Sequence, residues 1–329
     1  IRAIADALDA RAPKEPDNLR SIIREWRSAN PDRSSSPEWD RLADTTKKVW
    51  GNALDAIEAK WGDVPLAVFN DPRMKARIVR WRDSRRSTPR SADIGVTVLR
   101  ALLRFGELRG KVHNNAASGI PSIYRGGDRA EIIWTEDEIA AFSAKAAELG
   151  LSHAADGLRL AATTGLRRED LVSLTWDHVS AFGIRKKAMK RSRGKRRFAT
   201  VPTLPALDEL LDELRDRHRA IGVQTVLVDA KGNSWTPDRL TKAVGKVRDA
   251  VGFVHVDQET GQRRTKHLHD ARGTYATRLM TTSDLTDQDL AMIMGWSPEE
   301  VSRIRNHYVD QGAIIMALGE RIGRGGVNR

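Results

Sequence analysis

The chain has 329 residues and a formal net charge of +12, from 56 Lys and Arg against 44 Asp and Glu. Its length is enough for two domains, and its charge favours a polyanionic partner, foremost nucleic acid, because each neutralised phosphate releases condensed counterions. The lack of cysteine excludes disulfides, thiolate nucleophiles and cysteine-ligated zinc.

The sequence contains no apolar run long enough to cross a bilayer and no signal peptide, which predicts a cytoplasmic protein with no membrane partner. The lack of cysteine fits the same reducing compartment. The sequence begins at Ile1 rather than Met, so it is compatible with further residues upstream.

The first 112 residues have the apolar spacing of a helical bundle. Apolar residues recur at intervals of three and four over 19–26 and, less regularly, over 42–61. A helix within 73–90 would bury its apolar residues and expose many arginines, and Ser91 is expected to cap the next helix. We therefore predict a DNA-binding helical domain over 1–112 with a basic face.

A linker and a second domain are predicted to follow. Residues 113–133 have no helical period and are rich in Gly, Ser and Asn, which is typical of a linker. Thr135 and Glu138 form a capping box, so the second domain, 134–329, is expected to open with a helix.

The second domain has a mixed pattern. Residues 182–190 and 196–203 are expected to form two strands of a hairpin around the turn 191–195, and 225–230 a third strand. Further helices are predicted to begin at three capping sequences, Thr236-Pro237, Asp284 or Thr286, and Ser297-Pro298. The predicted fold is mainly α: a helical bundle, then an α+β domain with a small three-stranded antiparallel sheet.

Several residues of this domain are suited to chemistry on a phosphate. Thr164-Gly165-Leu166-Arg167 precedes Asp170, and a basic hairpin follows. His269 and Arg272 are three residues apart and would share one face of a helix. Trp296 and then Tyr308 come after them along the chain.

In this order, these elements resemble the tyrosine recombinases of the phage-integrase type. The resemblance covers about residues 130–310, and the preceding bundle is similar to the family's core-binding domain. It implies a bacterial or phage-encoded enzyme that cuts and rejoins specific sites in double-stranded DNA through a 3′-phosphotyrosine, without metal, ATP or other cofactor. It also implies a homotetramer on two synapsed sites, with accessory DNA-bending proteins as further possible partners.

The roles implied for these residues agree with their chemistry. Arg167 and Arg272 would stabilise the two non-bridging oxygens of the transition state, because guanidinium groups stay charged and donate in planar forks. Tyr308 would be the nucleophile, and His269 with the two arginines would favour its ionisation. Asp170 is expected to fix the local helix start.

The proton for the departing 5′ oxygen would come from a lysine of the hairpin. Lys190 is our choice, with Lys195 as the alternative. Lys190 is in phase with three apolar residues of its strand, Phe182, Ile184 and Ala188. Trp296 can donate through its indole N–H but cannot carry a proton, so we expect it to pack and to bind phosphate.

The other tyrosines, Tyr124 in the linker and Tyr275 after Arg272, are expected to be structural. Tyr308 lies twelve residues beyond Trp296, three more than is usual in the family, which leaves attack within its own subunit or in a neighbour open. The apolar residues near 314–318 would then belong to the core or dock on another protomer.

Other functions also fit parts of the pattern. A type IB topoisomerase uses similar residues, and a DNA-binding relative without catalysis would explain the charge; the separate basic bundle and the complete residue set favour a recombinase. A zinc site at His267, His269 and Asp270 lacks a spaced further ligand. The basic stretch 190–197 could act as a nuclear import signal, but a hairpin at an active site suits it better.

Overall fold

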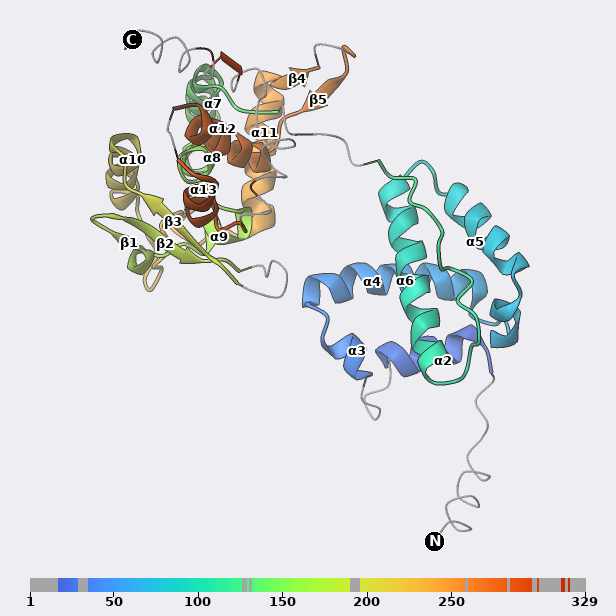
Figure 1. Ribbon diagram of the computed structural model, residues 1–329. Coiled ribbons are helices and arrows are strands. Elements are labelled where there is room, and N and C mark those ends of the chain that lie inside the picture. The colour runs from blue at the N-terminus through green and yellow to red at the C-terminus, as the bar shows by residue number, and fades with distance from the viewer. Residues whose placement is uncertain are drawn as a thin grey trace, which may run out of the picture. The chain divides into compact units, whose positions relative to one another are not determined.

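The computed structural model describes residues 17–28, 35–125, 129, 132–189, 196–257, 260–282, 285–297, 301, 315, 316 and 319. The chain divides into two compact units, Ile1–Gly126 and Gly127–Arg329 (Figure 1). The division falls inside the segment predicted as a linker. Each unit has a hydrophobic core of its own.

The first unit is a helical bundle, as predicted. Its helices are α2 (Leu19–Arg27), α3 (Pro37–Asp40), α4 (Asp44–Trp61), η1 (Leu66–Asn70), α5 (Arg73–Asp83) and α6 (Pro89–Leu108). Trp26 of α2 lies among three other aromatic rings, with centroids 5.7 Å from Trp39 and Trp50 and 6.0 Å from Phe105. This cluster joins α2, α3, α4 and α6 into one core.

The helix predicted to be capped by Ser91 begins at Pro89, and its N-cap residue is Thr88, three residues before Ser91. Proline is favoured in the first turn because its φ is already helical and its missing N–H would have no partner there. The prediction of Ser91 as the cap was therefore wrong, although the helix itself is confirmed.

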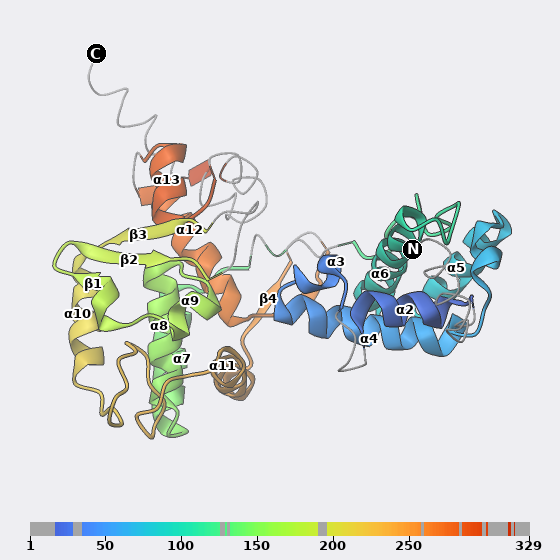
Figure 2. The same ribbon diagram turned by 90° about the horizontal axis from the view of Figure 1, so that it is seen from below.

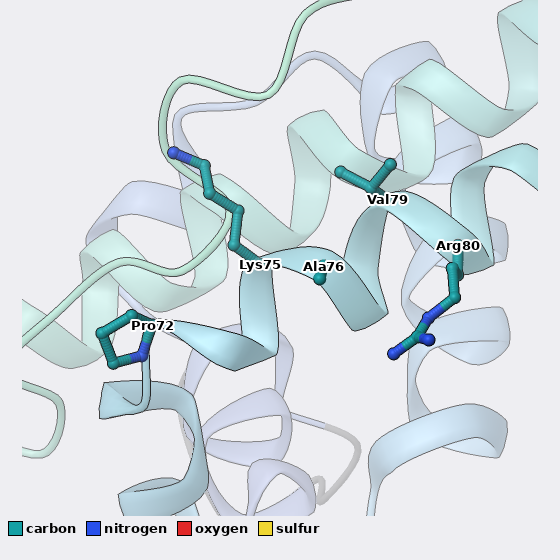
Figure 3. Close-up of a pocket in the computed structure, with 5 residues that line it drawn as sticks. All are labelled: Pro72, Lys75, Ala76, Val79 and Arg80. Atoms are coloured by element: carbon teal, nitrogen blue, oxygen red, sulfur yellow. The ribbon is translucent and has the colours of Figure 1, made fainter.

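The basic face of this unit lies on α5, where Arg73, Lys75, Arg77 and Arg80 are exposed. A shallow hollow on the same helix is lined by Lys75 and Arg80 together with Pro72, Ala76 and Val79 (Figure 3). Its floor is mostly apolar, and its only charged groups are cationic. This surface can bind an anion but contains no acid–base pair.

The segment that follows α6 is bound to the first unit. Asp93 of α6 accepts from the backbone N–H of Tyr124 at 2.7 Å, and Arg100 donates to the carbonyls of Ala117 and Ile120 at 3.0 and 3.1 Å. The first half of the predicted linker is therefore held against α6. The exact boundaries at residues 112 and 134 stay a prediction.

The second unit is built around α8. Its helices are α7 (Glu136–Glu148), α8 (Ser152–Thr164), α9 (Arg168–Val172), η2 (Trp176–His178), α10 (Pro205–Arg215), α11 (Pro237–Val251), η3 (Leu268–Asp270), α12 (Ala271–Thr282) and α13 (Asp287–Met294). Helix α8 contacts α7, α10, α11 and α12, and most of its side chains are buried (Figure 1). None of the helices in the described ranges has the length and apolar composition needed to traverse a lipid bilayer.

A three-stranded antiparallel sheet lies beside these helices, in the order β1 (Val179–Ser180), β2 (Gly183–Lys187), β3 (Phe198–Pro202). The predicted hairpin is confirmed, with Ile184 opposite Val201 and Lys186 opposite Ala199. Helix α13 packs against β3 (Figure 2). The sheet therefore connects the hairpin to helix α13.

The third strand is not the predicted one, because 225–230 forms only two isolated bridges. Asp229 accepts from the N–H groups of Lys231 and Asn233, and the resulting turn bends the chain away from a continuous ladder. A second, two-stranded sheet of β4 (Val254–Val256) and β5 (Arg263–Thr265) was not predicted.

The capping sequences predict helix starts well. Thr135, Thr236 and Thr286 each accept from a backbone N–H three residues on, and Thr135 and Thr286 belong to complete capping boxes. Of the two alternatives for α13, Thr286 is the cap. The helix predicted after Ser297 lies largely outside the described residues.

Replacing Thr135 by Ala should lower the free energy of unfolding of the second unit by about 1 kcal/mol, because the Glu138 N–H loses its acceptor. Thr135→Ser keeps the hydroxyl and should lie close to the parent protein. Urea denaturation of the three proteins measures this, and equal losses for Ala and Ser would contradict the role of the cap.

Candidate active site

Arg272, in the first turn of α12, joins two other segments of the second unit. Only 7% of the residue is exposed, and its guanidinium donates to the carbonyl of Gly165 and, at 2.8 Å, to that of Met294. The same group lies over the Trp296 ring, 4.8 Å from its centroid. Three segments that are distant in sequence therefore meet at one buried charge.

The turn before Arg167 depends on Gly165. Helix α8 ends at this glycine, whose φ of +59° is in the left-handed region. A Cβ built there would lie 2.6 Å from the Tyr275 ring and 3.0 Å from the end of Met294. Glycine is thus required twice, for the backbone conformation and for close packing.

Arg167 itself is the N-cap residue of α9 and is half-buried. Within the described ranges, no hydrogen bond or ion pair of its guanidinium to a protein acceptor is found. Its neighbour Arg168, by contrast, pairs with Glu169 and Asp238. A half-buried guanidinium without a protein acceptor is suited to an external anion.

His269 lies on η3, a 3-10 turn that runs directly into α12 at Ala271, so His269 and Arg272 lie on one continuous helical stretch. The residue is exposed, yet partial desolvation of the imidazole lowers its pKa below the usual 6.5. The charge of Arg272 lowers this pKa further, Asp270 opposes the shift, and Arg167 adds a smaller lowering. The charges of both arginines therefore act on His269 and favour its neutral form.

Trp296 follows Gly295, which ends α13 with a φ of +62°. The indole is 6% exposed and packs against Arg272. Packing is the role that its chemistry predicts. Arg167, His269, Arg272 and Trp296 are thus brought together by the fold.

Asp170 does not cap α9, contrary to prediction. Its carboxylate is buried and accepts from the backbone N–H of Met189 at 2.7 Å. It therefore fixes the end of β2 rather than the start of a helix, since the carboxylate points across to the hairpin. Lys190 and the alternative Lys195 lie outside the described residues, as does Tyr308.

The alternation of inward and outward side chains that pointed to Lys190 is only partly observed in the strand. Ile184 and Ala188 are buried, but Phe182 is 90% exposed because it lies in the turn before β2. Lys186, between Ile184 and Ala188 on the same face, is also buried. Sequence reasoning missed this residue, although the phase itself would have identified it.

The two other tyrosines are accounted for. Tyr275 is 2% exposed, which confirms the prediction of a core aromatic, and burial raises its pKa to about 12. Such a phenol is inaccessible to DNA and resists ionisation. Tyr124 belongs to the first unit, where it is exposed beside Arg90.

Two of the three residues considered for zinc, His267 and Asp270, are engaged with arginines. The Arg248 guanidinium lies 3.0 Å from His267 Nδ1, and Arg129 pairs with Asp270 at 2.6 Å. Among the residues that the structure describes, no cluster of three metal-ligating side chains is found. Asp270 instead holds Arg129, a residue near the start of this unit.

Residues 134–312 match the model of the Phage integrase family. No curated protein sequence matches the chain. Among solved structures, a lambda integrase dimer bound to a COC′ core site is 17% identical, with a TM-score of 0.71 over 90% of this chain and 96% of that one. A lambda integrase tetramer bound to a Holliday junction has 18% identity and a TM-score of 0.68 over 90% and 80%.

The integrase of the Tn1549 transposon, in complex with circular intermediate DNA, is 14% identical, with a TM-score of 0.64 over 88% of this chain and 95% of that one. At these identities the three structures indicate a shared fold. The family match covers the segment from Trp134 onward, which contains all the residues of the candidate site.

Gly165→Ala should destabilise the second unit by about 3 kcal/mol, because left-handed strain adds to a clash with Tyr275. Gly150→Ala is the matched control: its φ is +65°, but nothing lies within 4 Å of the added Cβ. It should cost only the strain, about 1 kcal/mol. Urea denaturation compares them, and equal losses would contradict the packing argument.

Proposed function

This chain belongs to the phage integrase family, the tyrosine recombinases, and we propose that it is a site-specific recombinase that cleaves and rejoins double-stranded DNA through a 3′-phosphotyrosine at Tyr308. The observation that supports this most strongly is that Arg272 donates to the carbonyl of Gly165, two residues before Arg167, while the charges of Arg272 and Arg167 both act on His269. No single segment of the sequence contains more than two of them.

In the proposed reaction, the Tyr308 phenolate attacks the scissile phosphorus and forms the P–O bond of the phosphotyrosine. The bond to the 5′ oxygen breaks, and that oxygen takes a proton from Lys190. The reverse step, with a 5′ hydroxyl as nucleophile, rejoins the strands. The phosphodiester energy is kept in the covalent intermediate, so the step needs no ATP.

The two arginines would stabilise the transition state. Negative charge grows on the two non-bridging oxygens, where preorganised donors are most effective. The guanidinium of Arg272 is already fixed by two backbone carbonyls and by Trp296. Arg167, with no protein acceptor among the described residues, would bind one of these oxygens directly.

We further propose that the basic face of α5 binds the DNA backbone together with the exposed outer face of β2, where Arg185 and Lys187 lie. These cations are suited to phosphates of any sequence. A lambda integrase has been solved as a tetramer on a Holliday junction. By analogy, this protein would act as a homotetramer on two synapsed sites.

Tyr308→Phe should abolish the covalent adduct that the parent protein forms with a suicide DNA substrate, nicked beside the cleavage site so that the cut strand diffuses away. Tyr275→Phe is the matched control and should keep the adduct, because Tyr275 is buried. Denaturing gel electrophoresis separates adduct from free protein. An adduct in the Tyr308 variant, or its loss only in the control, would reject the assignment.

The rate of cleavage should fall as the pH drops below the usual imidazole value of 6.5, because protonated His269 can no longer accept the phenol proton. The lowered pKa places this loss on the acidic side of 6.5. Single-turnover rates from about pH 5 to 8 measure it. The His269→Gln variant should cleave more slowly at pH 7, and its rate should not fall further at acidic pH. If the rate of this variant falls with pH as in the parent, His269 is not the titrating group.

A further inference from the structure

Lys186 is a buried lysine that the proposed reaction does not use. Lys186 is 6% exposed. It lies on the inner face of β2, between the buried Ile184 and Ala188. An ammonium group is costly to bury unless it is well hydrogen-bonded. Its neighbour Lys187, on the opposite face of the strand, is exposed.

The partners of Lys186 all lie in the segment that follows Arg167. Its Nζ donates to the Ser173 carbonyl at 2.7 Å and lies 3.3 Å from His178 Nε2. His178 is held in turn by Thr175, whose Oγ1 is 2.7 Å from Nδ1. Ser173 is the C-cap residue of α9, so Lys186 ties β2 to the end of that helix.

A second tie joins α9 to the chain just beyond β2, three residues after Lys186. The Met189 N–H donates to the carboxylate of Asp170, in α9, at 2.7 Å. The negative charge of Asp170 also acts on Lys186, where it opposes the desolvation that lowers the lysine pKa. Arg167 is the N-cap residue of α9, so this one short helix carries the first arginine and anchors the strand that leads to Lys190.

We propose that Lys186 is a positioning residue for DNA cleavage, which acts by holding β2 on α9 so that the hairpin lysine, Lys190 or Lys195, reaches the departing 5′ oxygen. This inference rests on the proposed function. It assigns Lys186 no contact with DNA. Loss of its tie affects delivery of the proton, whereas the contacts of Arg272 with the Gly165 and Met294 carbonyls do not involve Lys186.

The chemistry of the leaving group separates this role from a general structural one. A 5′ alkoxide needs a proton to leave, because alcohols are far weaker acids than thiols. A 5′-bridging sulfur leaves as a thiolate without one, since thiol pKa values are near 8.5. Substrates with oxygen and with sulfur at this position therefore report on proton delivery alone.

The test compares cleavage of nicked suicide substrates with a 5′-bridging oxygen or sulfur by the parent, Lys186→Met and Lys187→Met proteins. Methionine keeps the apolar length of Lys186 but cannot donate to Ser173. We expect Lys186→Met to cleave the oxygen substrate about 10- to 100-fold more slowly than the parent at saturating protein. The sulfur substrate should restore the parent rate.

Lys187→Met removes the same charge from the opposite face of the strand, and its oxygen-to-sulfur rate ratio should equal that of the parent. Lys190→Ala serves as the reference for loss of the acid. Should Lys186→Met fail to give the parent's circular dichroism spectrum, Lys186→Gln, with a shorter uncharged donor, takes its place and should show the same selective rescue.

Equal slowing of Lys186→Met on both substrates, or no slowing on either, would overturn the positioning role. An equal shift of the rate ratio in Lys187→Met would overturn it as well, because the effect would then be one of charge. Failure of the parent protein to form an adduct with either substrate would instead reject the proposed function.

Discussion

The buried guanidinium of Arg272 is the contact on which the candidate site depends. Taking a cation out of water is costly, and here the cost is offset by two backbone carbonyls and an aromatic ring from separate segments. One carbonyl belongs to Gly165, which ends α8 in the left-handed conformation. The other belongs to Met294, the last residue of α13, directly before the left-handed Gly295. Movement of either turn would leave the charge poorly satisfied, so both turns are held.

This arrangement accounts for the Arg167 guanidinium having no hydrogen bond or ion pair to an acceptor among the described residues. The loop that carries it is fixed through the Gly165 carbonyl and through the packing of Gly165 on Tyr275, without any use of the Arg167 side chain. Helix α9 then holds the hairpin in two ways: the Asp170 carboxylate accepts from the Met189 N–H, and the Ser173 carbonyl at its C-terminal end accepts from Lys186. In the part of the chain that the structure describes, these contacts hold the backbone around Arg167 and involve no hydrogen bond of its guanidinium.

The start of the second unit is tied to the same region. Arg129 pairs with Asp270, next to His269, and Lys266 donates to the Ile133 carbonyl at 2.7 Å and to Glu138. The segment that leads into α7 is therefore bound to the stretch that carries His269 and Arg272. In the first unit, Asp93 and Arg100 hold the segment after α6 in a similar way. Both ends of the predicted linker are anchored by hydrogen bonds, of which those of Arg100 and Lys266 are half-buried.

The sequence by itself determined the features that depend on neighbours along the chain. Apolar spacing identified the helices of the bundle, capping residues such as Thr135 and Thr286 marked helix starts, and the order of Arg167, His269, Arg272 and Trp296 indicated the family. These signals are local because a hydrogen bond three residues away, or a helix face, is encoded in a few adjacent positions.

Only the tertiary structure decided what those residues contact. Asp170 reaches Met189 instead of its own helix, Lys186 is buried on Ser173, and β1 takes the place of 225–230 in the sheet. The roles of Lys190 and Tyr308 stay predictions. The physical reason is that a carboxylate or an ammonium binds whichever acceptor or donor the strand register and helix packing bring to it, and register and packing are set by contacts between residues far apart in the sequence.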